Sequence, residues 1–190
     1  MSHPIELFRA RARLYRSYPT GASIKYVREH GLNTIRLAEV AGCFTVMRIQ
    51  PMGDRFEFSP DAKTVAAIVE AYGLDGETVN DLVAWPLEQP CRALTLLGRS
   101  PFLGAGNVFS ASTYAFDQPL VCYRTPLTWW GAGCGGVVIL DPLNAARILL
   151  DAPGKISGED ADHSREIAEL VRGLFDPSRF VAPATKRRAA

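Results

Sequence analysis

Three glycines in the last third of the chain have the spacing of a phosphate-binding turn. In the stretch WWGAGCGGVVILDP, Gly131, Gly133 and Gly136 match G-x-G-x-x-G, the pattern with which a strand-to-helix turn holds a dinucleotide. That chemistry needs a helix that begins at the glycines, because the free N–H groups of its first turn bind the phosphates. Here the glycines precede Val137–Leu140, an apolar run that predicts a buried strand, and a helix is expected only after Asp141. We therefore interpret the glycines as positions of close backbone packing and Asp141 as a helix N-cap.

The remaining candidates for chemistry are isolated residues. The four cysteines are widely separated and no histidine stands at ligand spacing, so the sequence predicts no metal site and no cofactor. Cys134 would be a nucleophile only if a cation or a helix N-terminus stabilised its thiolate, and a buried structural thiol is the simpler interpretation. His163, near the start of the last predicted helix, is expected to be solvated. The sequence also lacks the G-x-S-x-G and H-E-x-x-H motifs of common hydrolases, which favours a non-enzymatic role.

Positive charge is concentrated near the N-terminus. Seven basic and two acidic side chains precede residue 37, whereas the rest of the chain is acidic and the whole has a formal net charge of +1. This polarity favours a polyanionic partner, and nucleic acid is the partner that we expect. The residues predicted to contact it are Arg9, Arg13, Arg16, Lys25, Arg28, Asn33 and Arg36.

Residues 22–42 resemble a helix-turn-helix with Gly31 in the turn, and the hairpin predicted to follow stands where a winged helix has its wing. The resemblance implies that the second helix enters the major groove, where Asn33 and Arg36 would read bases while nearby cations meet phosphates. Val27 departs from the small residue usual in the first helix, and His30 from an apolar one. A helical layer with a solvated basic face is therefore the alternative interpretation.

The hydrophobic pattern predicts an α+β fold with a basic helical N-terminal part, a β-hairpin, and then helices packed on a small mixed sheet. The helical spacing of Ile5, Phe8, Ala12 and Tyr15 predicts the first helix, with the predicted arginines on an adjacent side. Of the adjacent Trp129 and Trp130, at most one is expected in the core. The predicted hairpin spans 43–59. The predicted helices are 60–73, 77–85, 90–98, 141–152 and 158–175, and the further strands are 108–116, 120–124 and 137–140.

These elements are predicted to form one unit: a basic helical segment with the hairpin over 1–59, an α+β core over 60–180 packed with it, and a flexible basic tail over 181–190. No apolar run approaches the roughly 20 residues that span a bilayer, and no export signal is visible, so a cytoplasmic protein without membrane contact is expected. The sequence favours a nucleic-acid-binding regulator or accessory factor. The alternatives are a small enzyme or ligand-binding protein that uses the glycine-rich loops 100–107 and 129–136, and a module that binds an acidic protein or a second copy of the chain.

Overall fold

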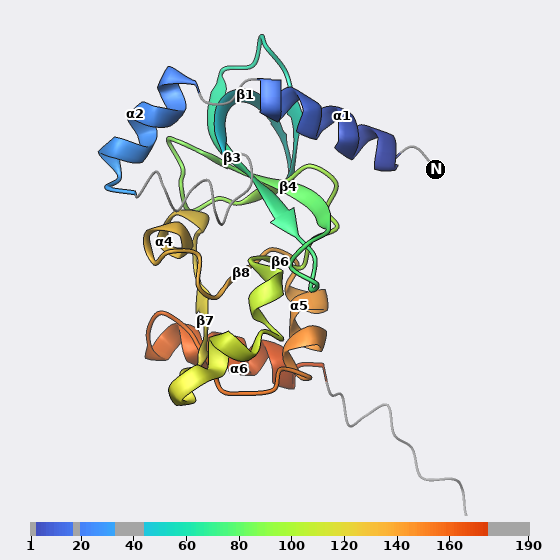
Figure 1. The fold of residues 1–190 in the computed structure, drawn as a ribbon. Helices are drawn as coiled ribbons and strands as arrows, with labels where there is room; N and C mark the ends of the chain where they lie inside the picture. Colours follow the sequence, from blue (N-terminus) through green and yellow to red (C-terminus); the bar gives the residue numbers. More distant parts are fainter. Residues whose placement is uncertain (1–2, 17–19, 33–43, 175–190) are drawn as a thin grey trace, which may run out of the picture.

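The computed structural model describes residues 3–16, 20–32 and 44–174, which build two sheets with helices around them (Figure 1). The first sheet is a closed barrel with the strand order β1-β2-β5-β4-β3. Neighbouring strands are antiparallel except for β2 and β5, which are parallel. The barrel strands are β1 (Thr45–Met52), β2 (Arg55–Phe58), β3 (Thr64–Tyr72), β4 (Val79–Pro86) and β5 (Leu94–Thr95).

The second sheet is mixed and lies in the C-terminal half, in the order β6-β8-β7-β9. β6 is antiparallel to β8, whereas β7 is parallel to both β8 and β9. Ala145, Leu149 and Ile167 pack on this sheet from two helices. The strands are β6 (Phe102–Leu103), β7 (Leu120–Tyr123), β8 (Val137–Ile139) and β9 (Ile156–Ser157). The helices of this half are η1 (Ala105–Asn107), η2 (Ala111–Asp117), α4 (Pro126–Gly131), α5 (Pro142–Leu149) and α6 (Ala161–Arg172).

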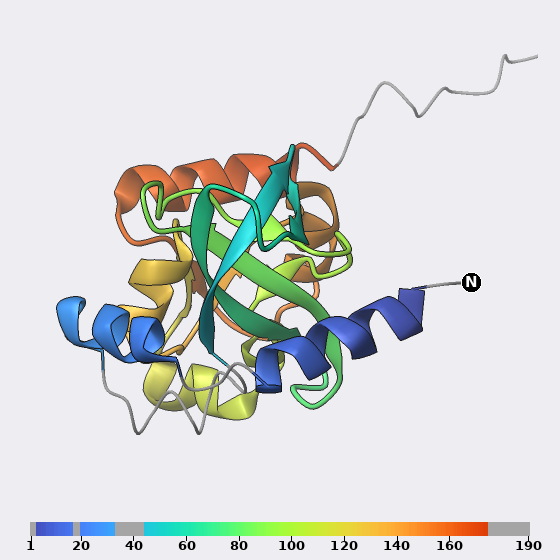
Figure 2. The same cartoon turned by 90° about the horizontal axis from the view of Figure 1, so that it is seen from above.

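Two N-terminal helices flank the barrel on different sides (Figures 1 and 2). The first packs on the barrel through Ala10 and Leu14, and the second buries Tyr26 and Val27. Thr20 caps the second helix, because its hydroxyl accepts the backbone N–H of Ser23 at 3.0 Å. The two are α1 (His3–Arg16) and α2 (Gly21–Glu29).

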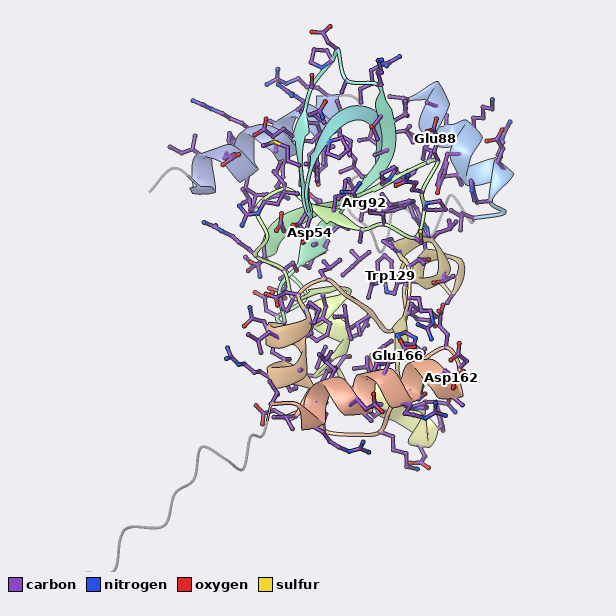
Figure 3. The ribbon with its side chains drawn as sticks, turned by 180° about the vertical axis from the view of Figure 1, so that it is seen from behind. Asp54, Glu88, Arg92, Trp129, Asp162 and Glu166 are labelled. Atoms are coloured by element: carbon purple, nitrogen blue, oxygen red, sulfur yellow. The ribbon has the colours of Figure 1, made fainter. Side chains whose placement is uncertain are left out.

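Tryptophans of α4 join the barrel to the second sheet. Trp129 and Trp130 are both buried, so the expectation that at most one lies in the core is wrong. They sit on a short helix between two apolar surfaces, and Figure 3 shows Trp129 between the barrel and the second sheet. The ring of Trp130 lies edge-on to Phe44 at 4.3 Å and to Trp85 at 5.7 Å between ring centres. One continuous core therefore fixes the two sheets against each other.

The barrel contains strands where helices were predicted. The predicted helices 60–73 and 77–85 are wrong, since these segments form β3 and β4. Both strands are buried on two faces: Ile68 points into the barrel, and Val69 into the core shared with the second sheet. A strand covered on both faces loses the apolar–polar alternation, so its apolar residues also matched helical spacing. The predicted helix 90–98 is wrong as well, because turns there surround the short strand β5.

The α+β fold with a small mixed sheet is confirmed. The predicted strand 108–116 is wrong, because most of it lies in η2. Its hydroxyls bond locally to the backbone: Thr113 donates to the Asn107 carbonyl and Tyr114 to the Val108 carbonyl, which competes with an extended strand. No helix in the described part of the chain is long and apolar enough to span a bilayer. The predicted elements that the structure confirms are the described part of the 43–59 hairpin, the strands within 120–124 and 137–140, and the helices within 141–152 and 158–175.

Candidate nucleic-acid interface

Helix α1 has two apolar stripes, and it turns the one with the aromatic side chains outward. Phe8 is 71% exposed and Tyr15 53% exposed, whereas Ala10 and Leu14 are buried against the barrel. The helix that the spacing from Ile5 to Tyr15 predicts is confirmed, and this stripe lies on its exposed side. Both stripes have helical spacing, so periodicity alone could not distinguish them.

A partly buried ion pair links α1 to the barrel. Arg11 Nε donates to Glu70 Oε1 at 2.6 Å, and the Glu70 side chain is completely buried. Tyr72 and Tyr15 donate their hydroxyls to Glu70 Oε2 at 2.9 and 3.4 Å. Burial lowers the pKa of Arg11, but the hydrogen bond and the charge of Glu70 outweigh it, so the pKa is raised overall. Arg11 therefore borders the face of α1 that Ala10 and Leu14 bury against the barrel, and it ties that edge of the helix to β3.

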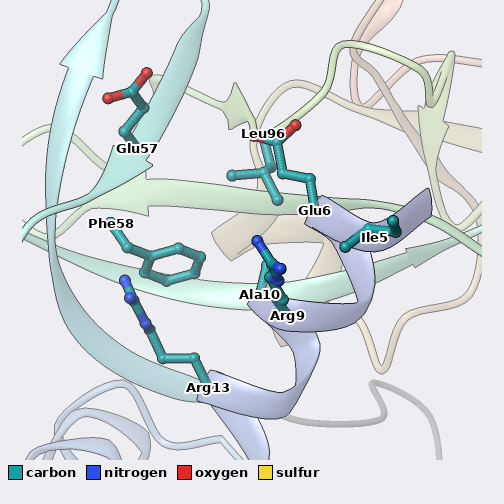
Figure 4. Close-up of a pocket in the computed structure, with 8 residues that line it drawn as sticks. All are labelled: Ile5, Glu6, Arg9, Ala10, Arg13, Glu57, Phe58 and Leu96. Atoms are coloured by element: carbon teal, nitrogen blue, oxygen red, sulfur yellow. The ribbon is translucent and has the colours of Figure 1, made fainter. Parts of the chain in front are cut away.

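A groove runs between α1 and β2 (Figure 4). Its volume is about 510 Å³, and a neighbouring hollow of about 570 Å³ shares Arg13 and Phe58 with it. The guanidinium carbon of Arg13 lies 5.2 Å from the centre of the Phe58 ring, which is a cation–π contact. We call the two hollows together the α1 groove. Its charged and aromatic lining consists of Glu6, Arg9, Arg13, Arg48, Glu57 and Phe58.

The structure separates the predicted nucleic-acid residues into groups. Arg9, Arg13 and Arg16 are exposed together on α1 and line one shallow hollow beside Phe8. Lys25 and Arg28 are exposed on α2, which lies on a different side of the barrel, and Lys25 pairs with a glutamate of its own helix. The remaining two predicted residues, Asn33 and Arg36, lie outside the described residues.

Two residues of the groove were missed from sequence. Phe58 lies on the same face of β2 as the buried Phe56 and contacts its ring edge-on at 5.5 Å, so the pattern would assign it to the core. It is only half-buried because it stands at the end of the strand. Arg48 donates to the Ala62 carbonyl at 2.8 Å and remains exposed. The polar–apolar alternation of β1 was the signal that could have placed Arg48 on the surface.

The segment that resembles a helix-turn-helix is described only in its first half. Helix α2 ends with Gly31 at a φ of +64°, as the turn requires, and Leu32 donates its backbone N–H to the Val27 carbonyl. The predicted second helix within 33–42 lies outside the described residues. The hairpin that followed it is part of the barrel wall, because β1 pairs with β3 and β2 pairs with β5. It is therefore not a separate wing.

The two glycine-rich loops meet in a second, smaller pocket where the barrel joins the second sheet. Asn107 Nδ2 donates to the carbonyls of Cys134 and Gly136, at 3.0 and 2.8 Å. Trp129 Nε1 donates to the Gly136 carbonyl at 3.0 Å. The pocket has a volume of about 360 Å³ and includes the buried Glu70 in its wall. We call it the junction pocket.

The last glycine of the G-x-G-x-x-G match, Gly136, serves packing, whereas Gly131 has open space around it. Gly136 leads into β8 with a φ of +102°, and a Cβ there would overlap the Val121 carbonyl. Asp141 caps α5, because its carboxylate accepts the backbone N–H of Asn144 at 3.2 Å. The interpretation as a helix N-cap is confirmed for Asp141, and that of close backbone packing is confirmed for Gly136 but is wrong for Gly131.

The remaining chemical candidates are structural where they are described. The prediction that His163 is solvated is wrong: it is 8% exposed, and its Nδ1 accepts the backbone N–H of Glu159 at 3.3 Å. Cys122 and Cys134 are buried free thiols and Cys91 is an exposed one. Within the described ranges, no group of three or more histidine, cysteine, aspartate or glutamate side chains is placed to hold a metal ion.

No protein-family model matches this chain, and no curated protein or solved structure matches it.

Proposed function

We propose that the protein binds nucleic acid through the exposed face of α1 and the α1 groove, as a non-enzymatic regulator or accessory factor. The observation that carries the proposal is the set of three arginines, Arg9, Arg13 and Arg16, held on a folded helix beside exposed aromatic rings. Polyanions are bound by such cations through their phosphates, with release of counterions.

Charge pairing distinguishes this face from the C-terminal helices. Arg124 is within 4 Å of Asp160 and Glu166, and Arg165 bonds to Asp162. The ion pairs found among the described residues include neither Arg9 nor Arg16. Arg9 and Arg16 are therefore available to an external anion at little cost in lost internal pairs.

A direct titration tests the proposal. Fluorescence anisotropy of labelled DNA and RNA oligonucleotides is measured against purified protein at low salt. Replacement of Arg9, Arg13 and Arg16 by alanine should weaken binding about 100-fold at roughly 0.1 M salt, because each lost phosphate contact is worth a factor of about 5 there. The matched control replaces three exposed arginines elsewhere, Arg99, Arg147 and Arg172, and should change binding by less than about threefold.

Two outcomes would count against the proposal. Failure of every oligonucleotide to bind at low salt would exclude it. An equal loss of affinity in the control variant would show that only net charge matters and that the α1 face has no special role.

A ligand-binding function at the junction pocket is the second candidate. It is favoured by the convergence of both glycine-rich loops, Asn107 and the ionised Asp75 on one small polar pocket. Hydrogen bonds from Thr78 lower the pKa of Asp75, so the pocket carries a fixed negative charge. A small-molecule library screened by thermal shift tests this candidate, with Asn107→Ala as the variant that should lose any hit. If every hit stabilises Asn107→Ala as well as the wild type, this pocket is not the binding site.

We further propose a cytoplasmic location. Three described cysteines are free thiols, as expected in a reducing compartment.

A further inference from the structure

We infer that the nucleic acid bound in the α1 groove is a single strand, with an unpaired base stacked at Phe58 and Arg13. This inference rests on the proposed function and adds the strandedness of the ligand to it.

The groove offers a flat, partly apolar surface beside cations. Phe58 is half-buried in the wall, and the Arg13 guanidinium stacks on its ring at 5.2 Å (Figure 4). Arg9 lines the same hollow, and Leu96 and Ala10 supply apolar walls. Each hollow, at 510 and 570 Å³, falls in the size range of about 300–1,000 Å³ in which proteins hold planar small molecules. Nucleobases stack on such aromatic and guanidinium surfaces whatever their sequence.

The charges in the groove favour bases over phosphates inside it. Glu6 and Glu57 line the same hollow as Arg9 and Phe58, and their carboxylates would repel a phosphate that entered. A carboxylate accepts hydrogen bonds from the amino groups of bases, so the same two residues are compatible with a base edge. The phosphates would lie outside, along Arg9 and Arg16 on the exposed side of α1.

A duplex cannot satisfy this arrangement. Its bases are stacked on each other and their amino groups are paired, so neither a ring face nor a free Watson–Crick edge is available to the groove. Only the outer arginines, which contact phosphates, would remain for a duplex. The structure therefore leads us to expect tighter binding of a single strand than of a duplex of the same sequence.

The test compares fluorescein-labelled single strands, DNA and RNA, with duplexes of matched sequence at the same salt concentration. We expect single strands to bind at least about tenfold more tightly. Phe58→Leu should remove most of that preference while leaving duplex affinity unchanged. Phe116→Leu, at a ring that is 96% exposed far along the chain, is the matched control and should have no effect.

A second variant keeps the test decisive if Phe58→Leu does not fold, as judged by its melting curve. Arg13→Lys retains the charge but loses the planar guanidinium, so it should lower single-strand affinity and spare duplex affinity.

The outcomes separate the inference from the proposal beneath it. Equal affinity for single strands and duplexes overturns the inference but leaves nucleic-acid binding standing. Absence of binding to both overturns the proposed function as well. Displacement of the single strand by poly-glutamate at the same charge concentration would indicate an acidic protein partner, and it would overturn both.

Discussion

The contact between Arg11 and Glu70 predicts a specific order of stabilities among variants of α1. Glu70 is the completely buried partner and Arg11 is 37% exposed, with 2.6 Å between Arg11 Nε and Glu70 Oε1. Replacement of Arg11 by methionine keeps the length of the side chain but leaves the carboxylate in the protein interior without its counter-charge. Breaking a buried pair in this way costs about 3–5 kcal/mol. Tyr72 and Tyr15 still donate to Glu70, and water can reach the site of Arg11, so we expect about 2 kcal/mol of lost unfolding free energy.

The double variant tests the ion pair more directly, through its unfolding free energy relative to that of Arg11→Met. In Arg11→Met/Glu70→Gln the buried group is a neutral amide that can still accept from both tyrosines, so no charge is stranded. The double variant should therefore be at least about 1 kcal/mol more stable than Arg11→Met alone, a non-additive result. Arg9→Met, on the exposed side of the same helix, should change stability by less than about 0.5 kcal/mol.

Urea unfolding followed by tryptophan fluorescence and circular dichroism gives the five free energies required: those of the wild type, the single variants Arg11→Met, Glu70→Gln and Arg9→Met, and the double variant. If Arg11→Met is as stable as Arg9→Met, or if the two substitutions in the double variant add, the ion pair does not hold α1 on the barrel. The stabilising role assigned to this contact would then be refuted.

Three further predictions concern the packing, the pH dependence and the thiols. Gly136→Ala should destabilise the protein by about 3 kcal/mol or more, because the added Cβ would overlap backbone atoms at a residue with positive φ. Gly131 has open space around it, so Gly131→Ala should cost nothing, and equal melting temperatures of the two variants would contradict the packing interpretation. Burial, and then the hydrogen bond to the Glu70 carboxylate, raise the pKa of Tyr72 above its usual value of 10, so the folded state holds the hydroxyl proton more tightly than the unfolded state. The stability that this proton supplies is complete below pH 10 and is lost as the pH rises above 10. The melting temperature should therefore drop further between pH 8 and about pH 11 in the wild type than in Tyr72→Phe, and an equal drop in both proteins would refute the effect. Burial raises the pKa of Cys122 to about 12, so its thiol should not react with a thiol reagent at neutral pH. The protein should therefore lose one equivalent of fast labelling when Cys91 is replaced by serine and none when Cys122 is replaced; the reverse pattern would refute the assigned burial.

Local chemistry made parts of the fold predictable from sequence. Asp141 followed by proline identified the start of α5, and Gly136 before an apolar run identified β8, because caps and close backbone packing are encoded within a few residues. The barrel was not predictable in this way. The runs that become β3 and β4 are apolar on both faces, and only the closure of the barrel and the second sheet behind it turns them into strands.

The candidate site was predictable in its charges but not in its shape. Arg9, Arg13 and Arg16 could be identified from the local excess of positive charge. The orientation of α1 depends on the barrel strands that Ala10 and Leu14 pack against, which lie far along the chain, so the sequence near the helix could not show which of its two apolar stripes is buried. Phe58 enters the site only because the strand that carries it ends beside this helix.

The dependence of affinity on salt tests the central claim, that the α1 arginines meet phosphates, most directly. Arg9 and Arg16 at the phosphates, together with the charges of Arg13 and Arg48 in the groove, make four cations beside a bound single strand. They predict a slope of log affinity against log salt of about −3, at roughly 0.7 per cation. Replacement of the three α1 arginines by alanine should flatten the slope to about −1 between roughly 50 and 200 mM salt. A variant slope equal to that of the wild type would show that these arginines do not contact the phosphates, and it would contradict the account.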